Sequence, residues 1–405
     1  MQTGRPARPP TRLRAISVVA AAACVMASLG SIVPATSAAA KTPRAVRITG
    51  PLHTRGGRIL DATGKRVRFL GVGVLDLAPG RGLSSDQTGS ECNGWHMPPD
   101  EAYANIRNWG FNSVRLAISW ANLEPAPPVR LGVAEIHHWN FEYLWALDEV
   151  IDEFTSRGIA VIIEMSQNGW SPAFKRHEYP GCPGRGFPAW LYEGTKTNTI
   201  WEAKREFFTN HDGVQDMYAT AWQVVAKRYA NRVMVVGADI MNEPFIDPAD
   251  MAPEDTNLEA MYEKLGGAIR EVAPRILLIF QDNQTRGLHV KLQPDEPPPF
   301  ANVVYQVHLY SVDWKNASPR MSQWTKVARR WNVPLYMGEF NGFGAGRNNK
   351  PAYPGWLKST NSLMSYCKQN GISWTYWAYW GGTSLTQPGT QQAKPKLLAA
   401  LQAGF

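Results

Sequence analysis

The sequence predicts an α/β fold, a (β/α)₈ barrel with an N-terminal β-hairpin and long loops at the carboxyl ends of its strands. Eight short apolar segments have the pattern of buried strands, and they alternate with amphipathic helices over roughly 340 residues, a length that suits such a barrel with insertions. A doubly wound open sheet is the alternative. It would normally carry a glycine-rich phosphate-binding turn after its first strand, and Gly71-Val72-Gly73 matches that turn only in part.

The strands are recognised as short runs rich in β-branched residues, and the helices by apolar positions three or four residues apart. Turn signals at Gly56-Gly57 and Thr63-Gly64 predict a small hairpin that leads into a first buried strand near residues 67–72. The other strands are expected at 113–118, 159–165, 233–241, 275–280, 302–307, 334–337 and 372–377. Helices are expected at 100–109, 140–157, 214–229, 258–272, 318–331, 355–369 and 394–401, and residues 76–98 and 166–212 have the composition of loops.

Residues 1–40 have the pattern of a secretory signal peptide. The segment begins with the basic residues Arg5, Arg8, Arg12 and Arg14. An Ala-rich apolar run over 15–33 follows, and Ala38-Ala39-Ala40 offers a cleavage site of small residues. A signal anchor and a lipoprotein site at Cys24 are the alternatives. We therefore expect a secreted monomer in which residues 41–405 form one (β/α)₈ domain, without stable membrane insertion after processing.

Composition and cysteine spacing limit the partners that we expect. The four Arg of the N-terminal segment account for half of the formal net charge of +8, and no block of like charge indicates nucleic-acid binding. No His/Cys cluster has zinc spacing, so we predict neither a metal nor a cofactor. Cys92 and Cys182 lie in loop-like segments of an exported chain and predict a disulfide, whereas Cys367 lies at helical spacing and predicts a buried free thiol.

Polar side chains follow the ends of the predicted strands. The run 233–241 ends in Asn242-Glu243-Pro244, and Pro244 cannot continue a central strand, so Glu243 stands at a strand end or caps a following helix. The carboxyl ends of all barrel strands meet at one mouth. The side chains expected to converge there are Arg115, Ser166, Asn242, Glu243, Gln281, Asp282, Asn283, His308, Tyr310, Glu339 and Trp377.

Two carboxylates facing each other across such a mouth suit glycoside hydrolysis. One carboxyl must protonate the leaving oxygen, while the other, ionised, attacks the anomeric carbon or positions water. Arg115 beside Glu339 would favour the ionised form there. The remaining polar and aromatic side chains would hold the sugar, with Trp377 as the floor under the ring.

The motifs resemble glycoside hydrolase family 5, the cellulase-like family of retaining β-glycosidases. The matching motifs are Ser113-Val114-Arg115-Leu116, Asn242-Glu243-Pro244, Gln306-Val307-His308-Leu309-Tyr310, Gly338-Glu339-Phe340 and Trp374-Thr375-Tyr376-Trp377. The resemblance covers about residues 48–400 and implies that Glu243 is the acid/base and Glu339 the nucleophile. At position 166 the sequence departs from the family, because Ser166 stands where the family usually has His.

The resemblance implies a hydrolase of β-linked oligosaccharides, polysaccharides or glycoconjugates, with endo-β-glucanase activity as the first expectation. The stretches 186–190 and 213–222 are similar to the endoglycoceramidase branch, whose members usually carry a C-terminal β-sandwich that has no counterpart here. A glycolipid hydrolase is therefore one alternative, and an exo-β-glycosidase or mannanase is another. A catalytically silent carbohydrate-binding barrel is the alternative from outside the enzymes.

Overall fold

Eight parallel strands close into a barrel in the computed structural model, in the order β10-β11-β12-β13-β4-β5-β8-β9. The structure describes residues 44–75, 77, 95–131, 134–167, 169–174, 186–244, 258–282, 295–310, 313–341, 353–380 and 384–405. All of them lie in the compact unit Thr42–Phe405. The predicted (β/α)₈ barrel is confirmed, and the doubly wound sheet is excluded because the sheet closes between β9 and β10.

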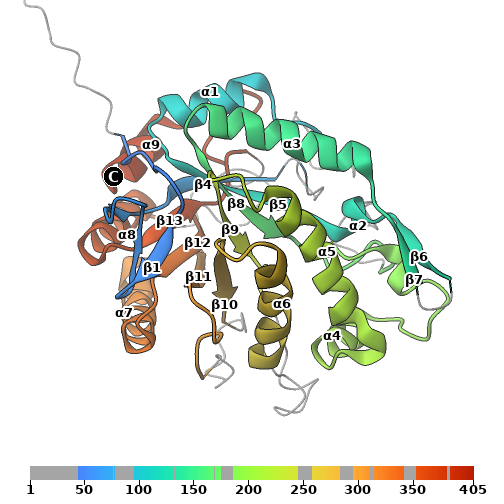
Figure 1. Ribbon diagram of the computed structural model, residues 1–405. Coiled ribbons are helices and arrows are strands. Elements are labelled where there is room, and N and C mark those ends of the chain that lie inside the picture. Colours follow the sequence, from blue (N-terminus) through green and yellow to red (C-terminus); the bar gives the residue numbers. More distant parts are fainter. Residues whose placement is uncertain are drawn as a thin grey trace, which may run out of the picture. The chain divides into compact units, whose positions relative to one another are not determined.

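The helices surround the barrel (Figure 1). The barrel strands are β4 (Leu70–Val74), β5 (Ser113–Ile118), β8 (Ala160–Met165), β9 (Val235–Asp239), β10 (Leu277–Gln281), β11 (Val303–Tyr310), β12 (Leu335–Asn341) and β13 (Ser373–Tyr376). The α-helices are α1 (Asp100–Asn108), α2 (Trp120–Leu123), α3 (Phe141–Ser156), α4 (Ile200–Phe208), α5 (Val214–Tyr229), α6 (Leu258–Val272), α7 (Trp314–Trp331), α8 (Trp356–Asn370) and α9 (Pro395–Gln402). Two short 3₁₀ turns are η1 (Ala189–Leu191) and η2 (His211–Gly213).

In helix α3, the capping residue, the apolar spacing and the glycine at the end all match what the structure shows. The Asn140 side chain accepts a hydrogen bond from the Tyr143 N–H at 3.1 Å and caps the first turn. Leu147, Ile151 and other apolar residues at helical spacing are buried against the barrel, and each such side chain contributes about 1.5–3 kcal/mol. The helix ends at Ser156, and Gly158 takes the left-handed conformation (φ 73°) that turns the chain into β8.

The amino-terminal end of the barrel is closed by apolar side chains. A small antiparallel sheet precedes the barrel and consists of β1 (His53–Arg55), β2 (Arg58–Leu60) and β3 (Arg66–Val67). Its residues Ile59 and Val67 form one buried cluster with the barrel residues Ile162, Val236 and Tyr336. The predicted N-terminal hairpin is thus confirmed, with a third strand added. Because this end is filled, polar groups inside the barrel lie toward the opposite mouth.

Three local predictions were wrong or incomplete. Residues 166–212 were expected to form a loop, but they contain α4, which begins with a capping box between Thr199 and Glu202. Helix α7 begins at Trp314 rather than 318, because Asp313 caps it and Pro319 lies inside it. The β-hairpin formed by β6 (Ala126–Leu131) and β7 (Ala134–His138) was not predicted.

Two further expectations concern cysteines and membrane spans. Cys367 is a buried free thiol, as predicted. Cys92 and Cys182 lie outside the described residues, so their disulfide stays a prediction. None of the helices in the described part of the chain combines the length and apolar character needed to span a bilayer.

Candidate active site

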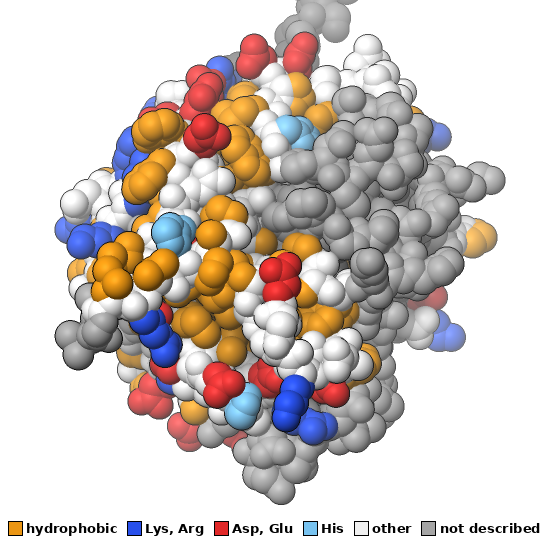
Figure 2. Space-filling view, turned by 90° about the vertical axis from the view of Figure 1, so that its right-hand side faces the viewer, with side chains coloured by type: hydrophobic (Ala, Val, Ile, Leu, Met, Phe, Trp, Pro, Cys, Tyr) orange, Lys and Arg blue, Asp and Glu red, His pale blue; other side chains and the backbone are white. Residues whose placement is uncertain are grey.

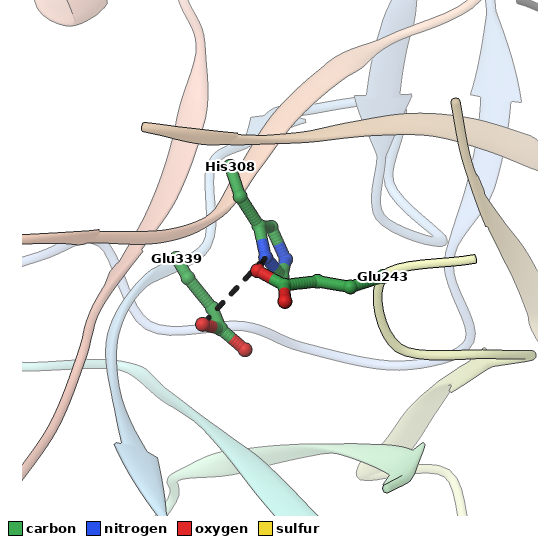
Figure 3. A group of neighbouring side chains, drawn as sticks. All are labelled: Glu243, His308 and Glu339. Carbon is green, nitrogen blue, oxygen red and sulfur yellow. Dashed lines mark hydrogen bonds and ion pairs between the residues drawn. The ribbon is translucent and has the colours of Figure 1, made fainter. Parts of the chain in front are cut away.

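The predicted site residues come together at the carboxyl ends of the barrel strands. Glu243 follows β9 by four positions, His308 and Tyr310 end β11, and Glu339 lies near the end of β12. Figure 3 shows the side chains of Glu243, His308 and Glu339 pointing toward one another from these separate elements. One carboxylate oxygen of Glu243 lies within 4.8 Å of one of Glu339. Two carboxyls therefore face a common space at the mouth.

Arg115 of β5 organises the floor of this space and is completely buried. Its Nη1 donates to Glu339 Oε1 at 2.6 Å, its Nη2 to Asn242 Oδ1 at 2.9 Å, and its Nε to Asp239 Oδ2 at 2.7 Å. A planar guanidinium suits this arrangement because its donors point in fixed directions. The predicted contact between Arg115 and Glu339 is confirmed, and Arg115 also holds Asn242.

Glu339 is held at both carboxylate oxygens. Oε1 accepts from Arg115, and Oε2 accepts from the Tyr310 hydroxyl. Burial raises the pKa of Glu339 above its ordinary value, and the nearby Glu243 adds to the rise, while His308, Arg115 and Tyr310 act to lower the pKa. The expectation that Arg115 favours the ionised form is thus right in direction, but burial outweighs it. Both contacts fix the orientation of the carboxylate toward the mouth.

His308 lies between the two carboxyls. Its Nδ1 is 2.9 Å from Glu243 Oε1 and 3.6 Å from Glu339 Oε2. Burial lowers the pKa of His308 to about 4, so the imidazole is neutral at neutral pH. A neutral ring can share one proton with Glu243 without adding a positive charge between the carboxyls.

The backbone around Glu243 is held in an uncommon conformation. Glu243 has φ 41°, in the left-handed region that residues other than glycine rarely adopt. Its N–H donates to Gln281 Oε1 at 2.9 Å, and the Gln167 amide donates to the carbonyls of Asn242 and Glu243. Such conformations persist where surrounding contacts enforce them, often at active sites. The two glutamines therefore set the direction of the Glu243 side chain.

Trp377 and Ser166 lie at the same mouth. Trp377 directly follows β13, and the Arg115 guanidinium lies 5.6 Å from its ring centre. A Cβ added at Gly73 would lie 2.6 Å from the Trp377 ring, so glycine is required where the indole crosses β4. Ser166 directly follows β8 and is half-buried, with its N–H donating to the Ile118 carbonyl at 2.7 Å.

Several polar residues of the site were not among the predicted residues. They are Glu164, Gln167, Asp239 and Gln306, all of them buried. Glu164 and Asp239 are acidic residues inside otherwise apolar strands, and that mismatch is the signal that could have identified them. Gln306 donates to Asp239 Oδ1 at 3.2 Å, and a Cβ at Gly338 would lie 2.3 Å from its Oε1.

The ligand atoms of Glu243, His308 and Glu339 are close enough to surround an ion. However, both oxygens of Glu339 already accept hydrogen bonds, and the Arg115 guanidinium stands 2.6 Å from one of them. A cation would have to compete with that positive charge. The arrangement therefore favours proton transfer and nucleophilic attack over metal binding.

We expect Arg115→Met to destabilise the fold by about 3–5 kcal/mol, because it leaves buried Asp239 and Glu339 without their cationic partner. Urea unfolding at pH 7 measures this effect. The matched control is Arg130→Met, which removes an ion pair with Glu135 on the surface and should leave the unfolding midpoint unchanged. Equal midpoints for the two variants would show that the Arg115 network does not stabilise the barrel.

Comparison with known proteins places this site in a family. The family model described as Cellulase (glycosyl hydrolase family 5) matches residues 70–383, which include every residue of the site. The chain belongs to glycosyl hydrolase family 5. It is therefore a glycosyl hydrolase, and the expectation of a non-catalytic barrel is set aside.

The relatives of this family 5 chain include two kinds of enzyme. It is 27% identical to Endoglycoceramidase I of Rhodococcus hoagii over 377 residues, covering 83% of this chain and 69% of the relative. It is 23% identical to an Endoglucanase of Paenibacillus polymyxa, covering 82% of this chain and 81% of the relative. The crystal structure of endogalactoceramidase superposes with a TM-score of 0.69 at 19% identity, covering 87% and 85% of the two chains, which shows the shared fold.

Proposed function

We propose that the chain is a retaining endo-β-glycosidase, with Glu339 as nucleophile and Glu243 as acid/base. The separation of the two carboxyls carries this proposal. One oxygen of Glu243 lies within 4.8 Å of one oxygen of Glu339, which favours the roughly 5–5.5 Å carboxyl spacing of retaining enzymes over the roughly 6.5–9.5 Å of inverting ones.

The proposed reaction has two steps. In the first, Glu339 attacks the anomeric carbon while Glu243 gives its proton to the departing glycosidic oxygen, so the glycosidic bond breaks and a glycosyl ester forms. In the second, water attacks the same carbon, Glu243 takes a proton from that water, and the ester bond to Glu339 breaks. Each carboxyl returns to its starting protonation state, and the sugar leaves with its original anomeric configuration.

The residues around the two carboxyls orient the nucleophile and bind the sugar. Arg115 and Tyr310 hold the two oxygens of Glu339, so the carboxylate reaches the sugar in one orientation. Because Asn242 Oδ1 accepts from Arg115, its amide N–H groups are directed elsewhere and can donate to the sugar 2-hydroxyl. The Trp377 ring provides a flat apolar floor for the sugar. Ser166, shorter than the usual histidine, leaves room for a substituent on that sugar.

The substrate class that we favour is a glycoconjugate with an apolar aglycone, such as a glycolipid. The observation that favours this substrate class is the β6–β7 hairpin, which follows the carboxyl end of β5. Val129 pairs with Ile136, and Leu131 with Ala134, so the exposed side chains of Val129, Leu131 and Ile136 share one face of the hairpin. We call this the apolar hairpin face. The exposed aromatic residues Phe141 and Trp145 follow in α3.

Figure 2 looks onto the side of the molecule where β6, β7 and α4 lie in Figure 1, and it shows hydrophobic side chains gathered there. Exposed apolar patches of this kind mark interaction sites, and Trp side chains favour the interface between lipid and water. The endoglycoceramidase among the relatives is consistent with such a substrate. We propose that the apolar hairpin face rests on the lipid part of the substrate or on the surface that presents it.

The double variant Leu131→Ser/Ile136→Ser tests this substrate class. We expect hydrolysis of a vesicle-borne glycolipid to fall about tenfold or more, because partial burial of two such side chains is worth over 1.4 kcal/mol. The rate on a soluble aryl β-glycoside should stay within about twofold, because the catalytic residues are untouched. The control is Val233→Ser, which removes an equally exposed apolar side chain before β9, at the opposite end of the barrel.

Equal loss on both substrates, or no loss on either, would contradict the role of the apolar hairpin face. β-Glucan is the second candidate substrate, supported by the endoglucanase among the relatives. Release of reducing sugar from β-glucan without release from glycolipid would establish it instead. In either case we propose that residues 1–40 direct export and that Cys92 and Cys182 pair in the oxidising environment that follows.

A further inference from the structure

Beneath the nucleophile, one guanidinium is surrounded by three buried carboxyl groups. Arg115 contacts Asp239 at 2.7 Å, Glu339 at 2.6 Å and Glu164 at 3.6 Å, and the side chains of Arg115, Asp239 and Glu164 are completely buried. The neutral His308 adds no positive charge at neutral pH. Three ionised carboxylates around one cation would leave a net negative charge in a region that water does not reach, which is costly.

The three carboxyl groups are not equally well stabilised as anions. Asp239 accepts hydrogen bonds from Arg115 and Gln306, and Glu339 accepts from Arg115 and Tyr310. In contrast, neither oxygen of Glu164 has a hydrogen-bond partner of normal geometry among the described residues, although the Ser166 side chain lies near enough to favour its ionised form slightly. The three hydrogen bonds of Arg115 go to Asp239, Glu339 and Asn242, and its nearest nitrogen stays 3.6 Å from Glu164, beyond hydrogen-bond distance. Glu164 is therefore the carboxyl for which ionisation costs most.

We propose that Glu164 is a protonated, neutral carboxylic acid in the working enzyme. Because it is neutral, it does not draw Arg115 away from its hydrogen bond with the nucleophile Glu339. Glu164 does not face the substrate, so it is a positioning residue that acts through Arg115. The protonation state follows from the buried cluster alone. The catalytic consequence rests on the proposed function, and the two parts are tested separately below.

The groups that face Glu164 from the surrounding elements agree with this assignment. They are Arg115 of β5, Ser166 after β8, Asp239 of β9, Glu339 of β12, Tyr143 of α3 and Tyr218 of α5. Burial raises the pKa of Glu164 to about 8, with Asp239 and Glu339 adding to the rise and Arg115 and Ser166 opposing it. Burial also raises the pKa of Tyr143 and of Tyr218, so both phenols are neutral.

Ionisation of Glu164 would disturb the nucleophile directly. Its carboxylate would attract the same Nη1 that donates to Glu339 Oε1, since that nitrogen is only 3.6 Å away. A shift of Arg115 toward Glu164 would lengthen the contact that orients Glu339, and a misaligned nucleophile reacts more slowly. We therefore expect Glu164 to contribute to the loss of activity at alkaline pH.

Thermal unfolding as a function of pH tests the protonation state without any substrate. An acid with a folded pKa near 8 and an unfolded value of 4.5 releases its proton on unfolding between these values, so it lowers stability as pH rises through this window. Glu164→Gln is isosteric with the protonated acid and removes this effect. We expect the Tm of the variant relative to wild type to rise by about 2–5 °C between pH 5 and pH 8.

The proposal is overturned if the Tm of Glu164→Gln relative to wild type stays constant or falls between pH 5 and pH 8, because a Glu164 that is already ionised at pH 5 would cause no such rise. Infrared difference spectra between wild type and Glu164→Gln give a second measurement, because the subtraction removes the band of protonated Glu243. A protonated-carboxyl band that the wild type shows at pH 7 and Glu164→Gln lacks supports the proposal, and equal bands in the two proteins at pH 7 overturn it.

The pH profile on a soluble aryl β-glycoside then tests the positioning role. We expect the ratio of kcat/KM of Glu164→Gln to that of wild type to rise about threefold or more between pH 6 and pH 9. A constant ratio together with the expected Tm shift would confirm the neutral acid but overturn its link to Glu339. If neither protein hydrolyses any glycoside, the proposed function fails, whereas the Tm result still decides the state of Glu164.

Discussion

Glu339→Gln is expected to lower kcat by about 10⁴-fold or more on every substrate, because an amide cannot form the glycosyl ester. The fold should remain intact, since the amide oxygen can accept from Arg115 while the amide NH₂ donates to the Tyr310 hydroxyl, which then acts as the acceptor. Steady-state kinetics on a soluble aryl β-glycoside measure the loss. The smaller variant Glu339→Gly leaves space for azide, which should restore activity and yield a glycosyl azide of inverted configuration.

The matched control for this prediction is Glu124→Gln. Glu124 is also a buried glutamate near the carboxyl end of β5, but its carboxylate bonds to Trp120 and His137 outside the catalytic group. This variant should keep kcat within about threefold of wild type, as expected for a group that touches no reacting atom. A comparable loss in both glutamate variants would show that burial, not chemistry, explains the effect of Glu339→Gln.

Glu243→Gln is expected to show a loss of activity that depends on the leaving group. For a substrate whose aglycone needs a proton, kcat/KM should fall by about 10²–10⁴-fold, the usual contribution of general acid catalysis. For an aryl glycoside with a strongly acidic phenol, kcat/KM should change little, because that phenolate leaves without protonation. The second step still lacks its base, so kcat should fall for both substrates.

A series of aryl β-glycosides with phenols of graded acidity measures this dependence. In the wild type, log(kcat/KM) should vary weakly with phenol acidity, whereas in Glu243→Gln it should vary steeply. Equal losses across the series would contradict the role of Glu243 as proton donor and would point to a role in substrate binding. His308→Gln provides the comparison, because it keeps a polar side chain beside Glu243 without removing the carboxyl.

The barrel and most residues of its candidate active site could be predicted because both depend on local signals. Apolar β-branched runs such as Ser113–Ile118 specify buried strands, and the polar residues at their ends necessarily meet at one mouth. Arg115, Asn242, His308, Tyr310 and Glu339 are joined by direct hydrogen bonds or close contacts, as their positions at the strand ends implied.

The features that were not predicted depend on contacts between residues far apart in the sequence, or on prolines at positions where they do not end the strand or helix. Pro127 and Pro128 argue against a strand, yet β6 accommodates them by a register shift between Ala126 and Val129 in a two-stranded hairpin. Helix α7 begins four residues before the predicted start at 318, because the Asp313 side chain caps it and Pro319 lies inside it. Glu164 could not be recognised as an unbonded acid, because its environment is assembled from strands far apart in the sequence.

Trapping the glycosyl ester tests the central claim most directly. A 2-deoxy-2-fluoro glycoside with a good leaving group slows both steps but slows hydrolysis of the ester more, so the intermediate accumulates. Intact-protein mass spectrometry should show one added fluoroglycosyl group, and peptide mapping should place it on Glu339, with no labelling of Glu339→Gln. Labelling of Glu243 or of any other residue, or full turnover with inversion at the anomeric carbon, would contradict the assignment of Glu339 as the nucleophile of a retaining enzyme.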